Sequence, residues 1–166
     1  GQLGDGGSTL PGTDTNVPPT TPIDLGAGRT AVEVSASSGE HACAILDNGD
    51  LKCWGKDQWG QLGDGGTNTN QPSPVSIDLG TGRTAVSVTT GRLHTCAILD
   101  DGSLKCWGGD NYGQLGDGGP AWTNSQRTDL NAPSSTAIDL GTGRTAVAVS
   151  AGEEHTCAIL DNGDLN

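Results

Sequence analysis

The stretch HACAILDNGDLKCWG at residues 41–55 recurs as HTCAILDDGSLKCWG at residues 94–108, and HTCAILDNGDL returns at residues 155–165. The apolar run Cys-Ala-Ile-Leu predicts a short β-strand that is buried on both faces. The Asp-Asn-Gly that follows it is typical of a tight turn, because Asn and Gly tolerate positive φ angles. We therefore predict a β-hairpin that is repeated along the chain.

The turn also sets which residues of the hairpin lie opposite one another. With a three-residue loop at residues 47–49, the expected pairs are Leu46 with Asp50, Ile45 with Leu51, Cys43 with Cys53 and, in the second copy, Cys96 with Cys106. Directly opposed positions have the Cβ separation that a disulfide requires. We predict both cysteine pairs to be disulfides, each worth about 2 to 4 kcal/mol of stability. Buried, reduced cysteines are the alternative.

Two further blocks repeat around the hairpin. GQLGDGG begins at Gly1, Gly60 and Gly113, and IDLGxGRTAV begins at Ile23, Ile77 and Ile138. Within the second block, Ala-Val-x-Val predicts a strand with its valines on one face. Copies of the blocks lie 53 to 61 residues apart, a period typical of a four-stranded propeller blade. The predicted fold class is all-β, with tandem four-stranded antiparallel blades of a β-propeller.

The order of these blocks, with His-Thr before the buried strand, Asp-x-Gly in the turn, Trp-Gly after it and then Gly-Gln-Leu-Gly, resembles the repeat of the regulator of chromosome condensation family. The resemblance implies a seven-bladed propeller, which needs about 400 residues. We expect two to three blades here, as a piece of a longer repetitive polypeptide. The predicted units are the tail of one repeat with a Thr/Pro-rich linker, two full repeats and a partial repeat, at residues 1–21, 22–74, 75–135 and 136–166.

Composition limits the partners. Leu, Ile, Val and Phe make up only 29 of 166 residues, so disulfides would have to replace missing apolar core. The 20 acidic residues against 8 basic ones give a net charge of -12, which disfavours binding to nucleic acid and to anionic membranes. No apolar stretch approaches the roughly 20 residues of a membrane span.

The fifth cysteine, Cys157, corresponds to Cys43 and Cys96, so its partner is expected just beyond Asn166. Cysteines paired at equal spacing in repeats are typical of oxidising compartments. We therefore predict an extracellular or cell-surface location.

The repeated polar residues give no catalytic or metal site. Each of His41, His94 and His155 lies two residues before a cysteine, but a fourth zinc ligand is not evident. We interpret Gly-x-Gly-Arg-Thr as a turn whose arginine pairs with a nearby aspartate, and the aspartates of GQLGDGG as turn residues rather than calcium ligands. We predict no metal, no cofactor and no enzymatic activity.

Binding residues are expected where the copies differ. Trp59 and Tyr112 occupy equivalent positions before GQLGDGG, with packing as the alternative to ligand contact. The linker at residues 120–137 contains Trp122 and Arg127, both residue types that are enriched at interface centres. We predict contacts by these four residues.

The predicted function is an extracellular, non-enzymatic binding or structural scaffold for protein or glycan surfaces, with self-association into a fibre as an extension. Two alternatives stay open. The family resemblance implies guanine-nucleotide exchange with chromatin attachment, and the rim aromatics suggest a carbohydrate-binding module.

Overall fold

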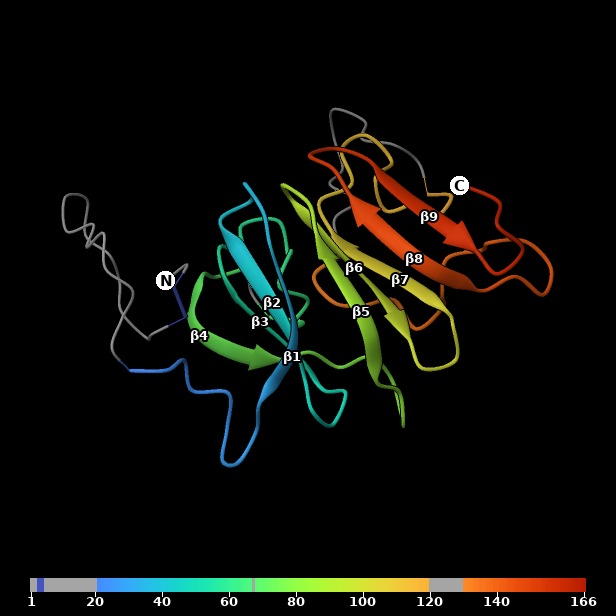
Figure 1. Cartoon of the computed structure of the whole chain (residues 1–166). Coiled ribbons are helices and arrows are strands. Elements are labelled where there is room, and N and C mark those ends of the chain that lie inside the picture. Colours follow the sequence, from blue (N-terminus) through green and yellow to red (C-terminus); the bar gives the residue numbers. More distant parts are fainter. Residues whose placement is uncertain (1–2, 5–20, 67, 120–129) are drawn as a thin grey trace.

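Three antiparallel sheets follow one another along the chain in the computed structural model, which describes residues 3–4, 21–66, 68–119 and 130–166 (Figure 1). The first sheet contains β1 (Ala31–Ala36), β2 (His41–Leu46), β3 (Leu51–Gly55) and β4 (Gln71–Ser76), in that order. The second contains β5 (Ala85–Thr90), β6 (His94–Leu99) and β7 (Leu104–Gly108), and the third contains β8 (Ala146–Ala151) and β9 (Thr156–Leu160). The predicted all-β class is confirmed.

Among the described residues, the predicted four-stranded blade is complete only in the first sheet. In the second sheet, the fourth position is marked by a bridge between Gly108 and Leu130, and in the third a bridge joins Ile159 to Leu165. Across the described ranges, no helix is long and apolar enough to cross a membrane.

The hairpins have the predicted register. Cys43 lies opposite Cys53 and Ile45 opposite Leu51, while the Leu46 amide donates to the Asp50 carbonyl at 2.9 Å. Gly49 closes the turn at φ 81°, a left-handed conformation that favours glycine. The disulfides Cys43–Cys53 and Cys96–Cys106 form, and every residue of β2 and β6 is buried, as predicted for a strand covered on both faces.

The prediction that the valines of the first strand share one face is wrong for the second blade, although Val32 and Val34 of the first blade are both 67% exposed. Val86 is 55% exposed, whereas Val88 is 5% exposed. The cause is a shift of register between Ala85 and Ser87, a bulge that recurs in the first and third sheets. A bulge inserts one residue against its partner strand and so reverses the faces on which later side chains lie.

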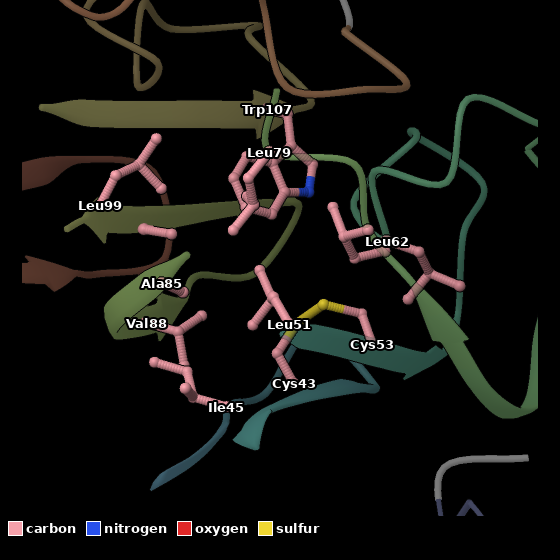
Figure 2. Packing of buried hydrophobic residues seen from close by; sticks show 12 residues of the cluster. Cys43, Ile45, Leu51, Cys53, Leu62, Leu79, Ala85, Val88, Leu99 and Trp107 are labelled. Carbon is pink, nitrogen blue, oxygen red and sulfur yellow. A yellow bond between two sulfur atoms is a disulfide. The ribbon is translucent and has the colours of Figure 1, made fainter. Parts of the chain in front are cut away.

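The core lies between neighbouring sheets rather than inside one. Figure 2 shows Cys43, Ile45 and Leu51 of the first blade facing Val88 and Leu99 of the second. A second cluster joins the second and third blades in the same way, with Cys96 and Ile98 beside Ala146 and Ala158. Each blade therefore buries its apolar residues mainly by contact with the next.

The face of the third blade that no described residue covers shows how much this contact matters. Ile159 is 43% exposed and Leu165 is 70% exposed, whereas the equivalent Ile45 and Ile98 are each 3% exposed. The same sequence is thus core in one setting and surface in another.

Glycine permits a close contact between blades. Gly63, in the GQLG turn of the first repeat, has φ 80°, and a Cβ at this position would overlap the indole of Trp107 in the second repeat. Figure 2 shows Leu62 beside this indole. Gly4 stands in the same relation to Trp54. Trp54 and Trp107 are buried packing residues.

A chain of hydrogen bonds crosses each seam between blades. The Thr95 hydroxyl donates to the Gln61 carbonyl at 2.7 Å, so His41 Nε2, 2.9 Å from Thr95 Oγ1, must be the donor of that second bond. The next seam repeats this arrangement: His94 Nε2 lies 2.9 Å from Thr156 Oγ1, whose hydroxyl donates to the Gln114 carbonyl. The repeated His, Thr and Gln residues are therefore structural.

Burial keeps these histidines neutral. Desolvation lowers the pKa of His41 and of His94 from 6.5 to about 4, and proximity to a neighbouring histidine adds to the effect in both cases. The neutral tautomer that donates from Nε2 is thus the form that holds each seam.

Removal of one hairpin disulfide should destabilise the fold. Because each bond closes a short loop in chains with little apolar core, Cys43→Ser together with Cys53→Ser is expected to lower the free energy of unfolding by about 2 to 4 kcal/mol. Urea denaturation measures this change. Cys157→Ser is the matched control, since Cys157 is exposed and forms no disulfide with any described residue, and its stability should equal that of the wild type. Equal stability of the double variant and the control would contradict the prediction.

Acid should weaken the seams. Because both histidines bind protons more weakly when folded than when unfolded, the free energy of unfolding should fall as the pH decreases from about 6.5 toward 4. The full effect is on the order of 3 kcal/mol per histidine, since one pKa unit corresponds to about 1.4 kcal/mol. Burial raises the pKa of Asp57 from 3.8 to about 6, which opposes part of the fall.

Urea denaturation of His41→Gln at several pH values isolates one seam. The amide can still donate to Thr95, so the variant should show a shallower fall of stability with acid than the wild type. His155→Gln changes an exposed histidine and should keep most of the wild-type slope. If the free energy of unfolding falls with acid as steeply in His41→Gln as in the wild type, protonation of His41 does not weaken the seam.

Candidate binding groove on the rim

Two equivalent loops hold the predicted aromatic residues in place. In the loop of residues 56–66, the Asp57 carboxylate accepts the Leu62 amide at 2.9 Å and the Gln61 side chain accepts the Trp59 amide at 2.9 Å. Asp57 and Gln61 are fully buried, and desolvation raises the pKa of Asp57 to about 6. These hydrogen bonds fix the backbone of the loop from inside. The tip of the loop lies at the rim of the propeller blades.

The loop of residues 109–119 repeats the same bonds. Asp110 accepts the Leu115 amide at 2.9 Å, and Gln114 accepts the Tyr112 amide at 2.8 Å. Trp59 and Tyr112 therefore occupy the same place on the same backbone in adjacent blades. Trp59 is partly buried beside Gly109 of the next blade, whereas Tyr112 is 66% exposed.

Both aromatic residues line one open groove of about 420 Å³, which we call the rim groove. Its lining comes from three consecutive repeats: Ser38 and Lys56 belong to the first, Arg92 to the second and Glu154 to the third. Trp59 and Tyr112, predicted as contact residues at equivalent positions of two repeats, thus line the same groove.

The charged residues of the rim groove are paired with one another. Lys56 lies 3.2 Å from Glu40, and Arg92 lies 3.4 Å from Glu154 of the next blade. Two cations and two anions cancel, so these four side chains carry no net charge in a chain whose total is -12. Because all four are partly exposed, each pair adds little to stability.

Sequence reasoning missed these charged residues. Glu40 and Arg92 occupy positions at which the three copies are not all alike, and Lys56 corresponds to Gly109 in the second copy; these differences were the one available signal. Only the packing of the blades shows that residues 40, 92 and 154 meet.

The opposite ends of the strands carry the repeated turns. The arginines of the Gly-x-Gly-Arg-Thr turns pair with aspartates of the hairpin turns, as predicted: Arg29 with Asp47 at 3.3 Å, Arg83 with Asp100 at 3.1 Å and Arg144 with Asp161 at 3.3 Å. The described aspartates of GQLGDGG lie instead in the two loops that carry Trp59 and Tyr112 and accept amides of their own turns, with Gly66 donating to Asp64 and Gly119 to Asp117, both at 2.8 Å.

The remaining predicted residues are distributed as follows. Trp122 and Arg127 lie outside the described residues. Cys157 is exposed. The described ranges contain no cluster of three or more His, Cys, Asp or Glu side chains placed to hold a metal ion. His41 bonds Thr95 and Cys43 forms a disulfide, so the pair considered for zinc is engaged elsewhere.

Comparisons with known proteins agree with this architecture. Human E3 ubiquitin-protein ligase HERC2 is 32% identical over 143 residues, which cover 84% of this chain and 3% of that protein. The crystal structure of human WBSCR16 is similar with a TM-score of 0.70 and 21% identity, covering 95% of this chain and 37% of the other. Yeast RCC1 (Prp20) bound to Kap60 gives a TM-score of 0.65 and 22% identity, covering 81% and 31%.

The chain therefore spans a small part of HERC2 and about a third of each solved structure. A sequence profile described as the regulator of chromosome condensation (RCC1) repeat matches residues 48–98 and 101–159, and a second of the same description matches residues 31–61 and 85–114. With blades that pack face to face as in the solved propellers, the chain belongs to the regulator of chromosome condensation (RCC1) repeat family.

Proposed function

We propose that the chain is part of an extracellular, non-enzymatic binding scaffold whose rim groove contacts the surface of a partner. The observation that carries this proposal is that repeated residues and variable residues have different roles in the structure. Residues that repeat are engaged in seams and turns, whereas the rim groove collects residues that differ between copies. Loops on a rigid scaffold are where binding residues concentrate.

The repeated polar side chains support a scaffold rather than a catalyst. His41 donates to Thr95, Cys43 is bonded to Cys53, and Asp57 accepts the Leu62 amide. A nucleophile or general base would need an accessible reacting atom. In these blades the same atoms hold the structure together.

The two disulfides support a location outside the reducing cytoplasm. Both are fully buried at seams between blades, where they form part of the apolar clusters. Structural disulfides persist in secreted and surface proteins and are rare in the cytosol. Exchange on a GTPase or chromatin binding, which family membership also permits, would place these cysteines in a reducing compartment.

Peptide mapping of the native protein without reduction tests the location. We expect Cys43 linked to Cys53 and Cys96 linked to Cys106. Free thiols at all four positions would contradict the extracellular proposal and favour the exchange-factor alternative.

Site-specific photo-cross-linking tests the contact surface. A photoreactive phenylalanine analogue placed at Tyr112, in the rim groove, should capture a partner from the native surroundings of the protein. The same analogue at Val86 is the matched control, because Val86 is also exposed but lies on β5, away from the rim groove. Equal capture at both positions, or none at Tyr112, would contradict a role for the rim groove.

A further inference from the structure

We infer that the rim groove binds an uncharged saccharide. This inference rests on the proposed function, since it names the chemical class of ligand for the same surface. It follows from three properties of the rim groove: its charge balance, its aromatic platform and the absence of strand edges in its lining.

Charge balance argues against a charged ligand. Each of the two cations lies beside a carboxylate, Lys56 beside Glu40 and Arg92 beside Glu154, so the rim groove presents no net positive charge to a phosphate or sulfate. A cationic ligand would have to displace Lys56 or Arg92 from these carboxylates. Paired side chains of this kind do suit sugar hydroxyls, because a fixed carboxylate accepts and a guanidinium donates in a fork geometry.

The aromatic platform suits a sugar ring. The ring of Tyr112 is largely exposed, and its backbone amide is bonded to the Gln114 side chain, so little backbone entropy is lost on binding. Trp59 adds a second aromatic side chain to the same lining. The C–H face of a pyranose is apolar and packs on such rings, while its hydroxyls reach the polar groups around them.

Hydrogen-bonding groups surround this platform. The Ser38 hydroxyl and the Asn111 amide both belong to the lining, and each can donate and accept. The volume of about 420 Å³ lies within the usual range of small-ligand sites, about 300–1,000 Å³. A short stretch of a glycan therefore fits in size and in chemistry.

A peptide is less well matched. Extended peptides commonly gain affinity by adding a strand to an exposed sheet edge. The lining residues of the rim groove lie outside the strands, in turns and loops. The groove thus offers side chains but no strand edge along which a peptide backbone could pair.

Binding of the full chain to an array of neutral, sialylated and sulfated oligosaccharides tests the inference. We expect binding to a subset of the neutral glycans, and similar binding at low and high salt, because no net charge is involved. Binding confined to the anionic glycans, or binding that salt abolishes, would overturn the inference, as would no binding to any glycan.

Variants at Tyr112 locate the site. Tyr112→Ala should weaken binding of the neutral glycan by about tenfold or more, whereas Tyr112→Phe, which keeps the ring, should bind nearly as the wild type does. Val86→Ala is the control for loss of an exposed side chain elsewhere. Unfolding in urea checks that each variant is folded. Full binding by a folded Tyr112→Ala would overturn the assignment.

The two proposals fail in different ways. Capture of a protein at Tyr112 by photo-cross-linking, without glycan binding on the array, would leave the binding scaffold standing and remove the saccharide. Glycan binding that depends on Tyr112 supports both.

Discussion

A blade of this chain cannot bury its own apolar residues, and the rest of the structure depends on that constraint. Each blade is a single sheet, so both faces of its hairpin strands are covered only when another blade packs against it. Ile45 is 3% exposed where the second blade packs against it, whereas Ile159, in a two-stranded sheet that no described blade covers on that side, is 43% exposed. The hydrogen bonds from histidine to threonine to glutamine carbonyl then fix how two blades meet, because buried polar groups tolerate few alternative arrangements.

The disulfides belong to the same solution. They lie at the seams, where their sulfur atoms pack among the leucine, isoleucine and valine side chains of the two clusters. A covalent link across the hairpin keeps its two strands in register even where packing is sparse. The paired cysteines in this sequence therefore compensate for its low apolar content.

Local chemistry could be predicted from the sequence, and the assembly of blades could not. The hairpin register follows from a turn whose residues are adjacent, so Cys43 and Cys53 could be paired directly. The bulge that separates Val86 from Val88 in exposure depends on pairing with the next strand and leaves no mark in the alternating pattern. Arg92 and Glu154 meet only after two blades have docked, so no spacing within one repeat predicts the rim groove.

The loops that hold Trp59 and Tyr112 have a consequence for how such a protein can vary. Their backbones are fixed by the same aspartate and glutamine contacts, yet one loop ends in an indole and the other in a phenol. The side chain at the tip can therefore be exchanged while the loop that supports it keeps its shape. Different residues of one loop thus fix its backbone and form its tip, and a family of artificial rims with new binding specificities could be built on one scaffold by changing a single position in each repeat.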